Sequence, residues 1–261
     1  MSRFTGRYVF VAGLHRTGTS LVARLIAEHQ DVAAITQSPA PEDEGVYLQG
    51  AIAHTARHGI PAHYATDPAQ HHIEGSRYDT QEVQHRLEAD WNRWFEPGGT
   101  WRVEKSPVNL TRMRLYQQLF PMSQFVIVLR HPEAMAAALA KWSDQPAEQL
   151  IDYALAAYEL AMQDARHLHA VLSVRYEDLV ADAKQEITRL DRFLSLQPHA
   201  RSASVRDGNE DYIGCDKMNA AQEQRAMPLG YLRGLGLRPS ALMARHPLRE
   251  TRNLIQRDVC N

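Results

Sequence analysis

A short apolar segment that runs directly into a glycine-containing loop most constrains the fold of this chain. Residues 8–13, YVFVAG, have the length and apolar character of a strand buried in a parallel sheet. The loop GLHRTGTS at residues 13–20 follows, and residues 19–29 carry apolar side chains at helical spacing. This order predicts a site where backbone N–H groups and a helix N-terminus bind an oxyanion.

The loop nearly matches the nucleotide-binding pattern G-x-x-x-x-G-K-[ST] but differs at one position. Thr19 stands where that pattern has its lysine, and the cation of the loop is Arg16 instead. A site for ATP or GTP hydrolysis would lack the cation that binds the β- and γ-phosphates. The loop therefore favours a different anionic donor. The alternative interpretation is a tight strand-to-helix turn without a ligand.

Further apolar segments alternate with helical patterns along the chain. Strands are expected at residues 32–35, 100–104, 124–129 and 170–174, and helices at residues 82–95, 110–120, 133–142, 150–168 and 187–194. Such alternation predicts an α/β fold of the P-loop type: three α/β/α layers, a central parallel sheet, helical insertions and an irregular C-terminal tail. We expect a single domain over residues 1–261. Its core should span about residues 8–194, with a C-terminal extension at 195–261.

The composition argues against several classes of partner. The 261 residues carry a formal net charge of −2, so we expect no basic surface for nucleic acid. No segment approaches the roughly 18 apolar residues of a membrane span. The two cysteines, Cys215 and Cys260, lack a metal-ligand spacing and favour a reducing compartment. We therefore expect a soluble, cytoplasmic protein whose anion site is local.

Charged residues follow three of the expected strands, where ligands bind in open α/β sheets. WRVEKSP at residues 101–107 places Lys105 at a strand end, and FVIVLRHP at residues 125–132 places Arg130 there. VRYEDL follows the last expected strand. Each motif also has a plain structural interpretation: a solvated ion pair, a surface arginine, or acidic residues at a helix N-terminus.

The order of these four motifs resembles the sulfotransferase superfamily, whose donor is 3′-phosphoadenosine-5′-phosphosulfate (PAPS). GLHRTGTS is similar to the 5′-phosphosulfate loop of the branch with R-[ST]-G-T-[ST], which includes tyrosylprotein and many bacterial sulfotransferases. VIVLRHPEAM is similar to the family's 3′-phosphate strand and helix, and VRYEDL to a further signature. The resemblance spans about residues 8–194. It implies transfer of a sulfuryl group to a hydroxyl or amine, with release of adenosine 3′,5′-bisphosphate (PAP).

The resemblance also implies roles for single residues. The 5′-phosphosulfate is expected at Arg16 and at the backbone of the next four residues, Thr17, Gly18, Thr19 and Ser20. Lys105 would stabilise the leaving phosphate or the transferring group, and Arg130 would hold the 3′-phosphate. Tyr176 would contact the adenine. Such a site works by positioning the reactants and by stabilising the negative charge that develops during transfer. We expect no metal requirement.

A general base must remove the proton of the acceptor, and the acidic loop PEDEG at residues 41–45 supplies candidates. In the tyrosylprotein branch the base is a Glu in this region, so the resemblance implies Glu44 or Glu42, with Glu44 favoured. An acidic solvent loop is the other interpretation.

The chain departs from the family where the 3′-phosphate is expected to bind. The family usually has a Ser eight residues after the strand-end Arg, whereas this chain has Ala138. Ser143 lies about one turn further on. The common form of the C-terminal glycine-rich stretch that clamps the 3′-phosphate is absent as well.

Five histidines gather in a segment whose structure the pattern does not predict: His54, His58, His63, His71 and His72. The first two have the i, i+4 spacing of a metal pair, but no H-E-x-x-H pattern is present, so we expect a solvated surface. A His base, as in cytosolic-type sulfotransferases, is an alternative. Trp91, Trp94 and Phe95 are expected in the core, with an acceptor pocket as the alternative.

Two other functions are kept as alternatives. A P-loop kinase for a small molecule would need the missing lysine and acidic ligands for Mg²⁺. A nucleotide-binding module without catalysis is supported by Ala138 and opposed by Arg16 and Lys105. The acceptor is open among small molecules, sugars, lipids and peptides, and so is the oligomeric state.

Overall fold

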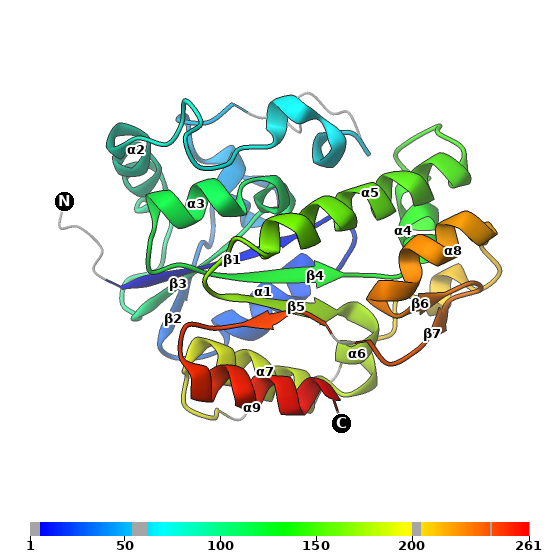
Figure 1. Ribbon diagram of the computed structural model, residues 1–261. Helices are drawn as coiled ribbons and strands as arrows, with labels where there is room; N and C mark the ends of the chain where they lie inside the picture. Colours follow the sequence, from blue (N-terminus) through cyan, green and yellow to red (C-terminus); the bar gives the residue numbers. More distant parts are fainter. Residues whose placement is uncertain (1–5, 54–61, 200–204, 241, 261) are drawn as a thin grey trace.

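The computed structural model describes residues 6–53, 62–199, 205–240 and 242–260 (Figure 1). The strands of its main sheet are β1 (Arg7–Gly13), β2 (Val32–Ala34), β3 (Trp101–Lys105), β4 (Gln124–Leu129), β5 (Val171–Arg175) and β8 (Ala244–Arg245). They lie in the order β2-β3-β1-β4-β5-β8. The first five pair in parallel, and β8 pairs antiparallel with β5. The predicted three-layer α/β class is confirmed. The sheet, predicted to be parallel, is mostly so, because only its edge strand β8 runs antiparallel among the described strands.

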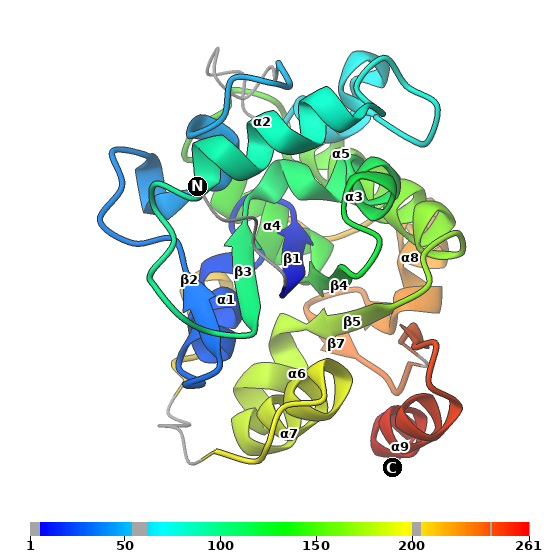
Figure 2. The same ribbon diagram turned by 90° about the vertical axis from the view of Figure 1, so that its left-hand side faces the viewer.

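Helices cover both faces of the sheet and complete the three layers (Figures 1 and 2). One layer holds α2 (Gln81–Trp91), α3 (Met113–Leu119), α4 (Pro132–Leu139) and α5 (Ala147–Ala165). The other holds α1 (Thr19–Ala27), α6 (Tyr176–Ala181), α7 (Ala183–Leu194) and α9 (Arg249–Cys260). Neighbouring residues of a strand face opposite layers: Phe10 packs in the first core and Val9 in the second.

The parallel register brings the carboxyl ends of four strands to one end of the sheet. Val11 of β1 pairs with Lys105 of β3, and Leu129 of β4 pairs with Arg175 of β5. The β1–α1 loop, Lys105, Arg130 and Tyr176 therefore follow neighbouring strand ends. Ligands of open α/β sheets bind at this end.

The C-terminal part is more regular than predicted, which corrects the expectation of an irregular tail. It contains α8 (Ala220–Ala226), a hairpin of β6 (Tyr231–Leu232) and β7 (Gly236–Leu237), the edge strand β8, and α9. A capping box of Asn219 and Gln222 begins α8, and Ile255 of α9 is fully buried in the second core. The single domain stays a prediction.

The remaining short elements are 3₁₀ turns. They are η1 (Pro41–Asp43), η2 (Gly45–Tyr47), η4 (Tyr64–Thr66), η5 (Pro68–Gln70), η6 (Pro107–Thr111), η7 (Glu210–Tyr212) and η8 (Met227–Leu229). The helix expected at 110–120 is thus divided into η6 and α3. Among the described residues, no helix combines the length and apolar character that crossing a membrane requires.

Candidate functional site

The β1–α1 loop has the backbone of an anion-binding loop. Arg16 has φ 71° and Gly18 has φ 98°, so the chain turns through the left-handed region twice. A Cβ on Gly18 would also lie 2.9 Å from the ring of Tyr176. The buried Thr17 donates its hydroxyl to the carbonyl of Leu14 at 2.8 Å and fixes the turn. Because the N-cap Gly18 has no side chain, the N–H groups that begin α1 remain available to a ligand.

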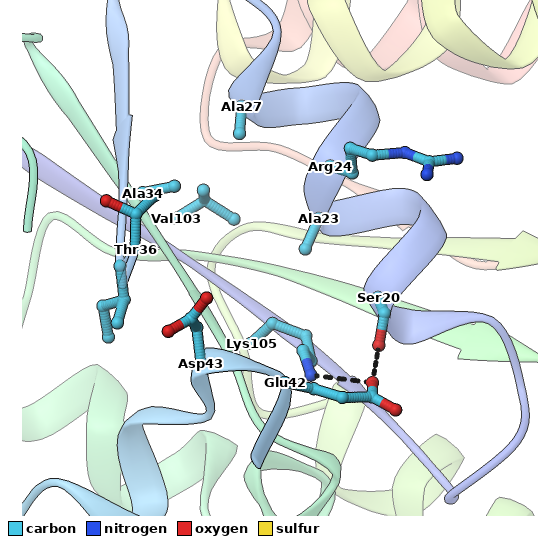
Figure 3. A pocket seen from close by; sticks show the side chains of 11 residues that line it. Ser20, Ala23, Arg24, Ala27, Ala34, Thr36, Glu42, Asp43, Val103 and Lys105 are labelled. Atoms are coloured by element: carbon cyan, nitrogen blue, oxygen red, sulfur yellow. Dashed lines mark hydrogen bonds and ion pairs between the residues drawn. The ribbon is translucent and has the colours of Figure 1, made fainter. Parts of the chain in front are cut away.

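Lys105 of β3 and the two candidate bases form one charged cluster. The Nζ of Lys105 lies 3.1 Å from Oε1 of Glu44 and 3.4 Å from Oε2 of Glu42. Ser20 donates its hydroxyl to the same Glu42 oxygen, which links the cluster to the first turn of α1 (Figure 3). The structure therefore brings together four predicted residues that are as much as 85 positions apart, since they are numbered 20, 42, 44 and 105.

The two carboxylates of this cluster differ in their environments. Burial raises the pKa of Glu44 to about 7, although the neighbouring Lys105 opposes the shift. The hydrogen bond from Ser20 is the main cause that lowers the pKa of the more exposed Glu42. At neutral pH Glu44 can therefore exchange a proton, whereas Glu42 remains an anion.

Glu104, next to Lys105, fixes the backbone directly after Glu44. Its buried carboxylate accepts hydrogen bonds from the N–H of Gly45 at 3.0 Å, from Ser106 at 2.6 Å and from Asn109 at 2.6 Å. Trp91 donates its indole N–H to the carbonyl of Gly45 at 2.9 Å. Glu104 is 1% exposed, so the solvated-ion-pair interpretation of the EK pair is wrong. Sequence reasoning missed this support.

Arg130, after β4, is held at the other end of the site by neutral groups. Its Nε donates to the amide oxygen of Asn209 at 2.7 Å, and its Nη1 donates to the carbonyl of Arg16 at 2.8 Å. The guanidinium carbon lies 4.4 Å from the ring centre of Tyr176 and 5.4 Å from that of Tyr212. Nη2 is buried and has no hydrogen-bond partner within the described part of the chain. A positive group of this kind can bind an anion.

Residues 205–212, which the sequence did not predict as part of the site, cover Arg130. Asn209 also donates its amide to Glu177 at 2.9 Å, and Glu177 accepts the N–H of His131 at 2.8 Å. The Tyr176 hydroxyl accepts the N–H of Gly208 at 2.7 Å. The sequence RDGN at 206–209 holds a glycine and an amide residue but no longer pattern that would have identified it.

The covering segment explains the departure at Ala138. This side chain is fully buried and packs with Ala134 against Tyr212, which belongs to η7. The ammonium of Lys141 also lies over the ring of Tyr212, with Nζ 5.2 Å from the ring centre. Ser143 accepts the N–H of Gln145 at 3.3 Å instead of lining the site. An aromatic ring therefore packs at the position where the family's serine is expected.

Two cavities meet at Ser20 and Glu42. The loop cavity, of about 240 Å³, is lined by seven of the predicted residues: Arg16, Gly18, Thr19, Ser20, Glu42, Glu44 and Arg130. The helix cavity, of about 270 Å³, lies between α1 and strands β2 and β3 (Figure 3). Ala27 and Ala34 line it on opposite sides, and Lys105 lies at its end nearest Glu42.

The other candidates of the sequence lie elsewhere. Trp91 and Phe95 are buried in the core, as predicted, and Trp94 packs against it. Nε2 of His71 lies within hydrogen-bond distance of Oδ2 of Asp164, at 2.7 Å, and neither cavity includes this residue. His54 and His58 lie outside the described residues. Within the described ranges, no three His, Cys, Asp or Glu side chains gather as metal ligands would.

Two solved structures share the fold of this chain. A crystal structure of a sulfotransferase from Alicyclobacillus acidocaldarius aligns with 88% of this chain and 96% of its own, with a TM-score of 0.51 and 17% identity. For a sulfotransferase from Mycobacterium avium the TM-score is 0.51, at 12% identity over 76% of this chain and 66% of that one. These structures share the fold. A search of curated protein sequences gives no significant match.

The sequence itself places the chain in a family. A family profile described as "Sulfotransferase family" matches residues 8–200, which is well over half of the chain. The match begins in β1 and extends beyond α7, so it includes the β1–α1 loop, Lys105, Arg130 and Tyr176. This chain belongs to the sulfotransferase family.

Proposed function

We propose that this protein transfers a sulfuryl group from PAPS to an acceptor hydroxyl, with release of PAP. The buried Nη2 of Arg130, which has no hydrogen-bond partner among the described residues, is the observation that carries the choice of donor. A buried guanidinium nitrogen without an acceptor is costly, and a phosphate oxygen would supply one. The resemblance to the family supports PAPS as the donor, and Arg130 supports a donor with a second phosphate beyond the 5′-phosphosulfate. The assignment to the R-[ST]-G-T-[ST] branch remains part of this proposal.

The residues present fit such a donor. The N–H groups of the loop and the Arg16 side chain would bind the 5′-phosphosulfate, in the loop cavity that Thr19 and Ser20 line. Arg130 would bind the 3′-phosphate, and Tyr176 would pack near the adenosine because its ring contacts both Arg130 and Gly18. Bound PAPS supplies the sulfuryl group and a phosphate leaving group.

Lys105 and Glu44 would carry the transfer itself. Glu44 would accept the acceptor's proton, because burial raises the pKa of its carboxyl to about 7 and places it near neutral pH. Lys105, 3.1 Å from Glu44, would stabilise the negative charge that develops on the leaving phosphate. Glu42 would hold Ser20 and Lys105 in place rather than act as the base. A cytoplasmic location and a reaction without metal stay predictions.

Thermal unfolding with PAP, compared with ATP plus Mg²⁺, tests this proposal. PAP should raise the free energy of unfolding by about 2.7 kcal/mol at a concentration a hundredfold above its dissociation constant. The release of PAP from PAPS in the presence of mixed acceptors should then report turnover. A larger effect of ATP with Mg²⁺ would favour the kinase. Binding of PAP without transfer to any acceptor would favour a module without catalysis.

A further inference from the structure

The carboxylate of Glu42 lies where the transferring group of the proposed donor is expected. Its Oε2 accepts a hydrogen bond from the hydroxyl of Ser20 and lies 3.4 Å from Nζ of Lys105 (Figure 3). Ser20 lines the cavity proposed for the 5′-phosphosulfate, and Lys105 is the cation proposed to stabilise the leaving phosphate. One carboxylate oxygen of Glu42 thus binds two side chains that an anionic ligand would need.

The turn that carries Glu42 is held in place, whereas its carboxylate is exposed. The N–H of Glu44 donates to the carbonyl of Pro41 at 3.1 Å, and the Asp43 carboxylate accepts the N–H of Ser38 at 2.8 Å. The Glu42 side chain is 63% exposed, and it lines both the loop cavity and the helix cavity. Its carboxylate can therefore turn aside for a ligand, but the turn keeps it beside the loop cavity.

Glu42 is a lasting negative charge at this place. The hydrogen bond from Ser20 lowers the pKa of its carboxyl, and the charges of Lys105 and Arg16 act in the same direction. An anionic ligand therefore meets these two cations together with the Glu42 carboxylate, and also the Glu44 carboxylate when that group is deprotonated. The repulsion by Glu42 is proportional to the charge of the ligand's nearest group, so it doubles when that group carries two charges instead of one.

Sulfuryl and phosphoryl groups differ in this charge. A terminal sulfuryl group carries one negative charge, whereas a terminal phosphate carries nearly two above neutral pH, because its second pKa is about 6. Both groups are tetrahedral and similar in size, so charge is the property that separates them best. Thr19 also replaces the lysine with which P-loop sites bind the β- and γ-phosphates, so that cation does not offset a second charge here.

We propose that Glu42 is a specificity-determining residue, which by its charge favours a donor that ends in a sulfuryl group over one that ends in a phosphoryl group. The inference rests on the proposed sulfuryl transfer from PAPS. When the donor binds, Ser20 and Lys105 turn from the Glu42 carboxylate to the terminal oxygens of the donor. The carboxylate stays close enough to repel that terminal group, and it repels a doubly charged group about twice as strongly.

Two nucleotides that differ only in the terminal group test the inference: PAPS and 3′-phosphoadenosine 5′-diphosphate. Their equilibrium binding is measured without an acceptor, in a metal-free buffer at about pH 8, where the terminal phosphate carries two charges. We expect the wild type to bind PAPS at least about tenfold more tightly. Glu42→Gln keeps an acceptor for Ser20 but removes the charge, so it should reduce this preference at least about fivefold, mainly by tighter binding of the diphosphate. The affinity for PAP, which lacks the terminal group, should change less than about threefold.

Asp43→Asn is the matched control. It removes the same charge from the adjacent residue, which lines the helix cavity and not the loop cavity, and it keeps the acceptor for Ser38 (Figure 3). The preference of the wild type should persist in this variant. An equal loss in both variants, a preference that survives Glu42→Gln, or a wild type that does not prefer PAPS would overturn the inference. A wild type that binds neither PAPS nor PAP would instead overturn the proposed function, so the two failures are distinguishable.

Discussion

Each end of the site holds one buried cation, and the two cations have opposite kinds of partner. At the end where the nucleotide is proposed to bind, here called the nucleotide end (Arg130, Tyr176 and Asn209), the guanidinium is held by a carbonyl, an amide and aromatic faces, all of them neutral. At the end proposed to carry the transfer, here called the transfer end (Lys105, Glu42 and Glu44), the ammonium lies between two carboxylates. Neutral partners position Arg130 without cancelling its charge, so that charge remains for a ligand. At the transfer end the net charge depends on whether Glu44 is protonated, and therefore on pH.

Lys105→Ala should give the largest effect and should separate the two ends. We expect transfer to fall by about 10³-fold, because the cation proposed to stabilise the leaving phosphate is lost. The affinity for PAP should fall by less than about tenfold, since Arg130 and the loop remain. Transfer kinetics and equilibrium binding of PAP measure the two effects, and the exposed Lys184→Ala is the control. Equal losses in both would show that the ends do not act separately.

Glu44→Gln should lower the transfer rate by about 10²-fold or more, which is the usual effect of removing a general base. The base must be deprotonated, so the wild-type rate should rise as pH increases through about 7, the raised pKa of Glu44. This rising limb of the pH–rate profile should be missing in Glu44→Gln. Glu42→Gln, the matched control, should keep it. A pH–rate profile of Glu44→Gln with an unchanged limb would exclude Glu44 as the base.

The same substitution should change how stability depends on pH. The pKa of Glu44 is raised from 4.5 to about 7 on folding, so its contribution to stability is fully present below pH 4.5 and is lost as pH rises toward 7. The loss amounts to about 3 kcal/mol by linkage. Urea unfolding at pH 5 and pH 8 should show a smaller decrease for Glu44→Gln than for the wild type. An equal decrease in both proteins would place the titration elsewhere.

Asn209→Ala should have a smaller effect, confined to the nucleotide end. Arg130 loses the acceptor of its Nε, so PAP affinity should fall about tenfold. Asn209→Asp keeps an acceptor but adds a carboxylate, which would give this end the charge balance of the transfer end. We expect it to weaken PAP at least as much. Titration calorimetry measures both, and wild-type affinity in Asn209→Asp would contradict the role of neutral partners.

The strand ends of the site follow from the sequence, and their surroundings do not. The positions of Lys105 and Arg130 could be predicted because each follows a buried parallel strand, and the sheet places the ends of such strands together. Their roles, and the choice of Tyr176, came from the resemblance to the family. Asn209 contacts Arg130 across 79 positions, and no local pattern encodes that contact. The burial of Glu104, which turns an apparent ion pair into the support of Gly45, likewise depends on the packing of Trp91 and η6.

The most direct test of the account compares PAP with adenosine 5′-monophosphate, which lacks the 3′-phosphate, in the wild type and in Arg130→Ala. The wild type should bind PAP at least about tenfold more tightly, because Nη2 of Arg130, which no described residue accepts a hydrogen bond from, can bind a phosphate oxygen. In Arg130→Ala the two nucleotides should bind almost equally, while the affinity for the monophosphate changes little. A preference for PAP that survives the substitution, or no preference in the wild type, would contradict the assignment of Arg130 and of the donor.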